Sequence, residues 1–575
     1  MLKLFRNLKP YAFAIAFVAV LVAGQTLAEL FLPTLMSDIV DRGIVKGDIP
    51  YILRIGGVML LVTLGGMVCA LVATLFSAQA SMGFGRDLRK KVFARVEGFS
   101  LHEFDIIGTP SLITRTTNDI TQVQMFTMML LRMMIMAPLM AVGGVIMAFQ
   151  KDAHLTWVLL VVIPILIAVI SLIAGRAMPL FRAIQAKIDK INQVLREGLT
   201  GVRVIRAFNR VEHDKERFDA ANLDLTDTSI KVNKLMAFMM PAMMLLMNFT
   251  AVAIIWFGAQ RIAIGEMQIG SLMAFIQYAM QILFSLLMVS LLFIMLPRAA
   301  ASAGRINEVL AMTAGIKEPD APRRAHEERG HIEFRNVTFS YPGAEVPAIR
   351  DISFSARPGE VTAIIGGTGA GKSTLVNLVP RFYDVASGSI LVDGVDIREM
   401  AQEDLRQRLG FIPQKAVLFN DTIAHNIRYG KEDASDAEVA HAAETAQALE
   451  FILAMPDGFQ SVISQGGTNV SGGQRQRLAI ARALVRKPEI YIFDDTFSAL
   501  DFRTDAKLRA ALRKETGEST VIIVAQRVNT VMDADRIIVV DDGGVAGMGT
   551  HRELIRTCEV YREIVSSQLS EEELA

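Results

Sequence analysis

Six long apolar segments in roughly the first 310 residues restrict the fold of this chain more than any other feature. Almost no charged residue interrupts them, and they lie at about 11–36, 55–78, 133–149, 155–175, 235–260 and 271–296. A helix needs about 20 mostly apolar residues to cross the hydrocarbon core of a bilayer. The segments therefore predict an all-α domain with six transmembrane helices. Lys3, Arg6 and Lys9 precede the first segment as in a secretion signal, but that segment is too long for a signal, and we interpret it as a retained helix.

Lysine and arginine concentrate in two of the connections between these segments. The connection between the second and third segments carries Arg86, Arg89, Lys90, Lys91, Arg95 and Arg115. The connection between the fourth and fifth segments carries ten basic residues from Arg176 to Arg217. Basic residues are enriched in cytoplasmic loops, so we expect both connections, both chain ends and the C-terminal domain on the cytoplasmic side. The helical pattern of both connections predicts that the transmembrane helices continue beyond the bilayer.

The third and fifth apolar segments are rich in methionine. "MFTMMLLRMMIMAPLM" begins at Met125, and "LMAFMMPAMMLLMNF" begins at Leu235. Three interpretations stay open: apolar filler, an adaptable wall for varied apolar ligands, and thioether ligands for Cu(I). Glu29 and Arg132 lie within or at the edge of apolar runs. Ionisable groups in such places are functional or paired, or extend to the membrane surface.

A polar, proline-containing stretch separates the membrane part from a second domain. We expect the six-helix domain and its cytoplasmic extensions over residues 1–314, a linker over 315–331 and a soluble domain over 332–575. Beyond the linker, short strands alternate with amphipathic helices, which predicts a layered α/β domain. A hydrophobic content of 52% together with 21% charged residues fits such a division.

Charge and cysteine content narrow the possible partners. The net charge of zero gives no reason to expect a nucleic-acid partner. The two cysteines, Cys69 and Cys558, offer neither a disulfide framework nor the spacing of a zinc site, which fits a reducing cytosol.

The sequence "VTAIIGGTGAGKSTLVNLV" combines a β-branched strand, a glycine-rich loop and a helix. Its glycines, lysine and serine have the spacing of a P-loop. In a P-loop, backbone amides surround the phosphates, the lysine neutralises the outer phosphates and the serine binds Mg²⁺. The residues predicted to contact a magnesium nucleotide are Gly366, Gly367, Thr368, Gly369, Ala370, Gly371, Lys372, Ser373 and Thr374.

The stretch "TNVSGGQRQRLAIARALVRKPEIYIFDD" is more specific still. With it the chain resembles the ATP-binding cassette (ABC) family over essentially its whole length. The resemblance implies that Tyr341 stacks on adenine, that Gln414 senses Mg²⁺ and the membrane domain, and that Asp494 binds Mg²⁺ with Ser373 and Gln414. It also implies that ATP bound by a partner chain contacts the family's signature and the loop between the cassettes. The matching residues are Ser471, Gly472, Gly473, Gln474 and Asp501.

Six transmembrane segments followed by one cassette resemble a half-transporter of the type IV exporter class. Two such chains make a complete machine, in which short coupling helices on the basic connections dock on the cassettes. By this resemblance we expect the coupling helices near Thr109–Arg115 and Arg210–Phe218. The expected setting is the inner membrane of a bacterium.

Two residues depart from the family pattern at the place of hydrolysis. The catalytic glutamate of the family is replaced by Asp495, which is one methylene shorter, and the switch histidine is replaced by Gln526. A glutamine can donate a hydrogen bond to phosphate but cannot carry a proton near neutral pH. Since a general base must come within hydrogen-bond reach of its water, we expect this chain's pocket to hold ATP and to cleave it poorly.

The departures predict a heterodimer. The intact signature of this chain would complete a hydrolytic site whose glutamate and histidine belong to a homologous partner. We expect export of a small amphipathic compound, either drug-like or lipid-like. Two alternatives stay open on the same fold: import of metal–siderophore complexes, and a nucleotide-gated channel or regulator.

Overall fold

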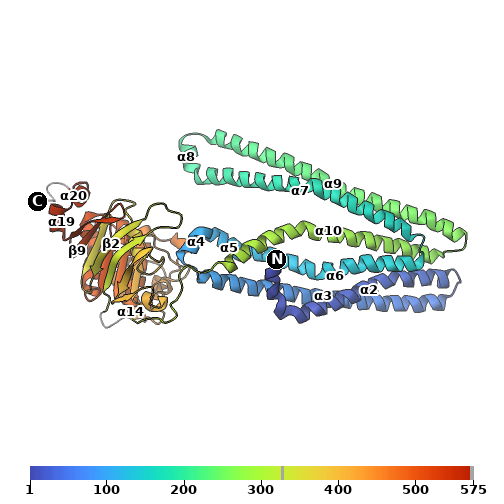
Figure 1. The fold of residues 1–575 in the computed structure, drawn as a ribbon, viewed down its shortest axis with the longest axis horizontal. Helices are drawn as coiled ribbons and strands as arrows, with labels where there is room; N and C mark the ends of the chain where they lie inside the picture. Colours follow the sequence, from blue (N-terminus) through green and yellow to red (C-terminus); the bar gives the residue numbers. More distant parts are fainter. Residues whose placement is uncertain (325–328, 570–575) are drawn as a thin grey trace. The chain divides into compact units, whose positions relative to one another are not determined.

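The computed structural model describes residues 1–324 and 329–569 (Figure 1). Part of the expected linker, 325–328, and the last six residues of the expected soluble domain, 570–575, lie outside the described residues. The chain divides into two compact units. Unit 1 consists of Met1–Glu97 and Pro110–Met312, and unit 2 of Gly98–Thr109 and Thr313–Ala575.

Unit 1 is built from helices long and apolar enough to cross a membrane. Among the described residues there are six, each 42 to 53 residues long: Lys3–Ile44, Ile49–Glu97, Thr109–Lys151, Thr156–Thr200, Val211–Ala263 and Ile269–Ala311. A helix of 42 residues is roughly 60 Å long at 1.5 Å per residue, about twice the thickness of the hydrocarbon core. The predicted six-helix domain is confirmed, and the extension of its helices beyond the bilayer stays a prediction that agrees with their length.

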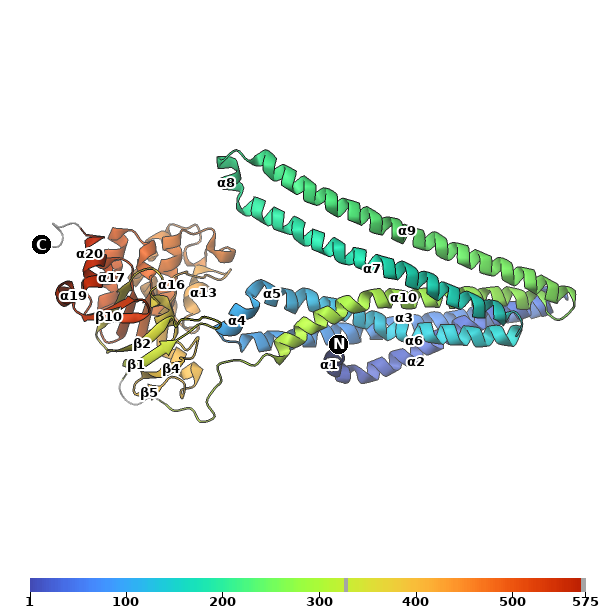
Figure 2. The same cartoon turned by 45° about the horizontal axis from the view of Figure 1, so that its top comes forward.

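The elements of unit 1 follow one another with short connections. Helix α6 packs against α10, α2 packs against α3, and α7 runs beside α9 (Figure 2). The bounds are α1 Leu2–Phe5, η1 Arg6–Tyr11, α2 Ala12–Asp38, η2 Ile39–Ile44, α3 Ile49–Glu97, α5 Thr109–Thr114, η3 Arg115–Asp119, α6 Ile120–Lys151, α7 Thr156–Thr200, α8 Val202–Ala207, α9 Val211–Ala263 and α10 Ile269–Ala311.

Two ion pairs, each with a buried carboxylate and a partly exposed arginine, connect helices of this unit. Asp119 is fully buried and accepts hydrogen bonds from Arg305 Nε at 2.7 Å and from Ser302 Oγ at 2.9 Å. Asp152, in the short connection after α6, accepts from Arg261 Nε at 3.0 Å. Breaking a buried pair by removing one partner leaves an uncompensated charge, so these contacts hold the helix ends in register.

The expected positions of the coupling helices stay predictions. The first, Thr109–Arg115, includes the short helix α5, which continues into the long helix Thr109–Lys151, and most of the second lies in the first turns of α9. Two further short helices precede these positions: α4, Leu101–Ile107, and α8, Val202–Ala207. Local chemistry sets the position of α4: Ser100 and Glu103 form a capping box that starts it. Gly108, with a φ of 79°, ends it.

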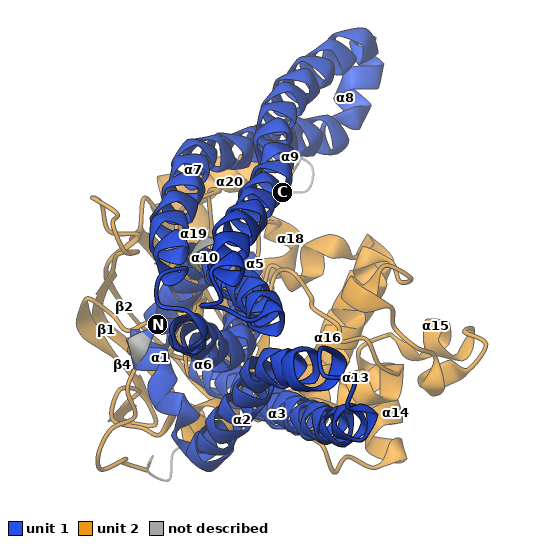
Figure 3. Cartoon of the chain, turned by 90° about the vertical axis from the view of Figure 1, so that its right-hand side faces the viewer, with its two compact units in different colours: residues 1–97, 110–312 blue, residues 98–109, 313–575 orange. Residues whose placement is uncertain are grey.

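Unit 2 contains two β-sheets (Figure 3). The first has the order β2-β1-β4-β5 and is antiparallel, with β1 Ile332–Phe339, β2 Ile349–Ala356, β4 Ser387–Val392 and β5 Val395–Asp396. The second has the order β10-β9-β3-β8-β7-β6 and is parallel except for β10, with β3 Val361–Gly366, β6 Leu409–Ile412, β7 Ile490–Asp494, β8 Thr520–Val524, β9 Arg536–Asp541 and β10 Gly544–Gly549.

The parallel strands are buried on both faces. Alternate residues of β3 enter two different cores: Ala363 and Ile365 join one, and Ile364 joins the other. This explains why the strands read as continuous apolar runs rather than alternating ones. The helices of unit 2 are α4 Leu101–Ile107, α11 Lys372–Asn377, α12 Gln402–Gln407, α13 Ile423–Arg428, α14 Asp436–Thr445, α15 Leu449–Leu453, α16 Gly472–Arg486, α17 Phe502–Glu515, α18 Val528–Val531, α19 His551–Thr557 and α20 Glu559–Ser566. The predicted α/β domain is confirmed.

Candidate nucleotide-binding site

Four neighbouring parallel strands deliver the predicted site residues to one edge of a sheet. Strands β3, β8, β7 and β6 are adjacent in that order. The P-loop follows β3, Gln526 follows β8, Asp494 ends β7 with Asp495 next to it, and Gln414 follows β6. The carboxyl ends of parallel strands are where open α/β sheets bind ligands. Residues that lie up to 160 positions apart in sequence therefore meet at one place.

The glycine-rich loop has a conformation that side chains would obstruct. Gly371 has a φ of 96°, and a Cβ added there would lie 2.6 Å from the carbonyl oxygen of Ala348. A Cβ on Gly366 would lie 2.0 Å from the carbonyl oxygen of Val540. Lys372 Nζ donates to the carbonyls of Gly366 at 2.9 Å and Gly367 at 2.7 Å. Burial lowers the pKa of the Lys372 ammonium, and the nearby carboxylates of Asp495 and Asp494 oppose that shift.

A hydroxyl and a carboxylate meet at the start of α11. Ser373 Oγ donates to Asp494 Oδ1 at 2.8 Å, and Asp494 is only 4% exposed. Burial raises the pKa of Asp494, the charge of Asp495 raises it further, and the bond from Ser373 opposes both. Mg²⁺ prefers one or two protein oxygens together with phosphate oxygens. The pair Ser373–Asp494 fits such an ion.

Asp495 is held by two amides. Its Oδ2 accepts from Gln414 Nε2 at 3.0 Å and from Gln526 Nε2 at 2.7 Å. The residue is 7% exposed and lies in the left-handed region with a φ of 46°. Its backbone N–H donates to the Val524 carbonyl at 3.0 Å. The two residues that depart from the family pattern, Asp495 and Gln526, therefore contact each other directly.

Tyr341 lies against the P-loop helix. Its hydroxyl is 3.1 Å from Thr374 Oγ1. Its ring makes edge contacts with Phe339 at a centroid distance of 5.0 Å and with Tyr383 at 5.5 Å. The structure thus places Tyr341, which is predicted to stack on adenine, next to the P-loop residues that are predicted to bind the phosphates.

The signature residues lie at a helix start that faces solvent. Ser471 caps α16 and forms a capping box with Gln474, whose N–H donates to Ser471 Oγ at 3.2 Å. Ser471 and Gly472 are exposed, and Gly473 and Gln474 are partly exposed. Within the described residues, no hydrogen bond joins these four to the P-loop, Asp494 or Asp495. The single chain therefore does not bring its own signature to its own P-loop.

Asp501 begins α17. Its carboxylate accepts from the Thr504 N–H at 2.9 Å, and this hydrogen bond lowers its pKa. The residue is exposed.

Sequence reasoning missed a contact between α4 and the nucleotide end of the cassette. Tyr383 Oη donates to Asp105 Oδ2 at 2.8 Å, and Tyr383 also packs on Tyr341. Burial and the bond to Asp105 raise the pKa of Tyr383. The Ser-x-x-Glu pattern at Ser100 and Glu103 is the sequence signal that locates α4.

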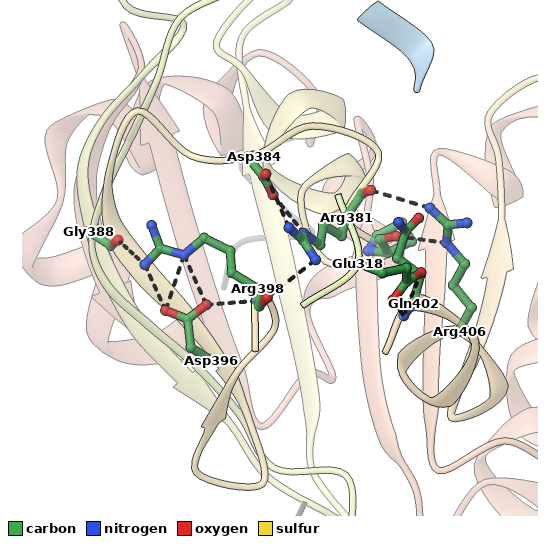
Figure 4. A network of polar contacts seen from close by, with 9 residues as sticks. Glu318, Arg381, Asp384, Gly388, Asp396, Arg398, Gln402 and Arg406 are labelled. Atoms are coloured by element: carbon green, nitrogen blue, oxygen red, sulfur yellow. Dashed lines mark hydrogen bonds and ion pairs between the residues drawn. The ribbon is translucent and has the colours of Figure 1, made fainter. Parts of the chain in front are cut away.

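A polar network holds the segment that carries Tyr383 (Figure 4). Arg381 Nε donates to Asp384 Oδ1 at 2.7 Å, and Arg406 Nε donates to the Pro380 carbonyl at 3.1 Å. Arg398 forms a two-pronged contact with Asp396 and also donates to the Gly388 carbonyl at 3.0 Å. Bidentate arginine contacts fix orientation as well as distance, so the segment presents Tyr383 to α4 in a defined position.

Comparisons with known proteins agree with this arrangement. Residues 15–286 match the family model for the ABC transporter transmembrane region, and residues 349–498 match the ABC transporter model. The chain is 45% identical to an uncharacterized ABC transporter ATP-binding protein of Mycobacterium tuberculosis, covering 98% of this chain and 97% of that protein. It is 30% identical to an ATP-dependent lipid A-core flippase of Syntrophus aciditrophicus, covering 100% and 95%. A solved structure of a bacterial Atm1-family ABC exporter with ATP bound is similar with a TM-score of 0.81 and 26% identity, covering 98% and 99%.

Proposed function

The chain belongs to the ABC transporter family and has the fold of its exporters, and on this premise we propose that it is the weakly hydrolytic subunit of a heterodimeric ATP-driven exporter. Its own pocket binds Mg·ATP. Its signature completes the hydrolytic site of a homologous partner that has the glutamate and the histidine. The proposed setting is the inner membrane of a bacterium, with the cassette in the cytoplasm.

One observation carries this proposal: Asp495 Oδ2 accepts hydrogen bonds from both Gln414 and Gln526. A general base needs a free lone pair within reach of the attacking water. Asp495 is shorter than glutamate by one methylene, and one of its oxygens is already occupied by two amides. Neither amide can take up the proton near neutral pH. The two amides hold Oδ2 in place, and Oδ1 is carried on a side chain that reaches one methylene less far than that of a glutamate.

The residues that bind nucleotide are retained. The P-loop amides and Lys372 would hold the phosphates, Ser373 and Asp494 would hold Mg²⁺, and Tyr341 would contact adenine. When bound, Mg·ATP supplies the charge that draws two cassettes together. Gln414 contacts Asp495 and would report the state of the pocket to the membrane domain.

The signature is suited to act on another chain. Helix α16 begins at the exposed residues Ser471 and Gly472, and the N-terminus of a helix favours a negatively charged γ-phosphate. Asp501 would lie at the same subunit contact.

Two short helices are suited to couple the cassettes to the membrane domain. Helix α4 docks on this chain's cassette through Asp105 and Tyr383. Helix α8 exposes the apolar side chain of Val204, and the next residue after the helix, Phe208, is exposed too; the two are 60% and 74% exposed. Large exposed apolar residues on a short helix suit docking on a cassette.

The proposed substrate is a small amphipathic, lipid-like compound. Support comes from the relatives named ATP-dependent lipid A-core flippases, whose names state a lipid as the transported molecule. Further support comes from a cavity in the membrane unit that methionines line.

Replacing Asp495 by Glu and Gln526 by His in one chain tests the weakly hydrolytic pocket. We expect phosphate release by the partner-free chain to rise at least about tenfold, a part of the ~10²–10⁴-fold that a positioned general base contributes. The matched control is Asp495→Gln with Gln526→His, which has the same side-chain length without the carboxylate and should show no rise. Equal rates for both double variants would contradict the proposal.

A further inference from the structure

A cavity of about 790 Å³ lies within unit 1, between α2, α6, α9 and α10. Nine of its fifteen lining residues are methionines. Most come from the segment that begins at Met125, while only Met247 comes from the methionine-rich part of α9. The volume is in the range of sites for small organic ligands. Of the interpretations left open for the methionines, an adaptable wall fits α6, and contact with lipid or neighbouring helices fits most of α9.

Two opposite charges lie on this wall. Glu29 and Arg132 both line the cavity and are both half-buried. Glu29 Oε1 accepts from Gln25 Nε2 at 2.9 Å. Arg132 has neither an ion pair nor a hydrogen bond to any residue within 1–324 and 329–569, so Glu29 does not neutralise it. A guanidinium without a partner in a membrane-spanning segment is costly, and its usual explanation is a functional contact.

A third polar side chain in the cavity wall, Gln281, has an oxygen without a hydrogen-bond partner among the described residues. The Oε1 atom of Gln281 is buried and accepts no hydrogen bond from any described residue, although its Nε2 donates to the Glu29 carbonyl at 3.3 Å. A buried acceptor that stays unpaired destabilises the protein unless a ligand or water satisfies it. The mostly apolar wall of the cavity therefore carries the carboxylate of Glu29, the guanidinium of Arg132 and the unpaired amide oxygen of Gln281.

We propose that this cavity binds an amphipathic zwitterion, with its anionic group at Arg132, its cationic group at Glu29 and its apolar chain among the methionines. The inference rests on the proposed transport function and specifies the substrate class. A purely cationic ligand would leave Arg132 unpaired, and a purely anionic ligand would face the carboxylate of Glu29. The guanidinium also opposes a bare metal cation among the thioethers. Unbranched methionine side chains repack easily, so the site would accept apolar chains of different shape.

Three photoreactive probes with the same diazirine-bearing alkyl chain and different headgroups test the proposal. They carry phosphocholine, trimethylammonium and phosphate, and the protein is the full chain in lipid nanodiscs. Crosslinking to α6 is measured by peptide mass spectrometry over a concentration series. We expect the zwitterionic probe to reach half-maximal labelling at about tenfold lower concentration than the trimethylammonium or the phosphate probe, because only the zwitterion places an opposite charge against both Arg132 and Glu29.

Substitutions at Arg132 and Glu29 test which of the two charges binds which group of the probe. Arg132→Gln should weaken the phosphocholine and phosphate probes about tenfold and leave the trimethylammonium probe unchanged, whereas Glu29→Gln should weaken the phosphocholine and trimethylammonium probes. Arg54→Gln and Glu216→Gln are matched controls, since both residues are exposed and lie outside the cavity wall. Arg132→Lys keeps the charge and should keep the preference, which guards against loss of folding in the glutamine variant.

The outcomes separate this inference from the proposed function. Equal labelling by all three headgroups, or a variant that weakens all three equally, would overturn the zwitterion site. Neither result would change ATP turnover by the heterodimer, which depends on the cassettes. Rapid ATP hydrolysis by the partner-free chain would contradict the proposed function and leave the headgroup preference untouched.

Discussion

The chain purified without a partner, in lipid nanodiscs, should bind Mg·ATP and hydrolyse it about 10²–10⁴-fold more slowly than the heterodimer, because every site then lacks a positioned base. Asp495 is short and held by Gln414 and Gln526. ATP binding and phosphate release are measured on the same preparation.

Lys372→Ala provides the control for binding. It removes the ammonium from the phosphate loop, so it should lower ATP binding by the isolated chain while the slow hydrolysis falls with it. Hydrolysis by a partner-free preparation at the rate of the heterodimer would show that Asp495 is an adequate base.

In the heterodimer, a change in this chain's signature should slow ATP turnover more than a change in its P-loop. Ser471→Ala removes a cap from α16, and Gly472→Glu places a carboxylate where a γ-phosphate would bind. Loss of one transition-state donor costs about 10²–10³-fold, and the carboxylate should cost at least as much through repulsion. Lys372→Ala affects only the weakly hydrolytic pocket, so its effect on steady-state phosphate release at saturating ATP should be smaller.

Gly472→Ala is the matched control for the glutamate substitution. A Cβ at this position meets nothing closer than Arg475 Nη2 at 4.0 Å, so a side chain fits without disturbing this chain's own fold. We expect the alanine variant to lose much less turnover than the glutamate variant. Equal losses from Lys372→Ala and Gly472→Glu would contradict the division of labour between the two sites.

Much of the fold could be predicted because it depends on local apolar pattern. The six apolar segments predicted the helices of unit 1, since length and lack of charge suffice for that inference. The P-loop could be predicted because a strand, a glycine-rich loop and a helix are contiguous in sequence. Asp494 could be paired with Ser373 because the family pattern places both at Mg²⁺, and the structure brings them to 2.8 Å.

Contacts between distant residues could not be predicted in the same way. That Gln526 donates to Asp495 depends on β7 and β8 being neighbours in the sheet, which the sequence does not state. The same holds for Tyr383 and Asp105, which are 278 positions apart. The short helix α4 was not predicted, although the capping box at Ser100 and Glu103 marks its start in the sequence.

Which methionines line the cavity and which are exposed could also be seen only from the three-dimensional structure. Two segments of similar composition have different surroundings: Met140 of α6 is buried at the cavity, whereas Met240 and Met244 of α9 are exposed. Composition alone does not show which face of a helix meets a cavity.

The nucleotide in this chain's own pocket provides the most direct test of the central claim. The heterodimer is irradiated during steady-state turnover of 8-azido-ATP, labelled in parallel samples at the α-phosphate or at the γ-phosphate, and the two chains are separated. The account predicts equal α and γ label on this chain, because its pocket retains the triphosphate, and a deficit of γ label on the partner. A γ deficit on this chain as large as that on the partner would contradict the account.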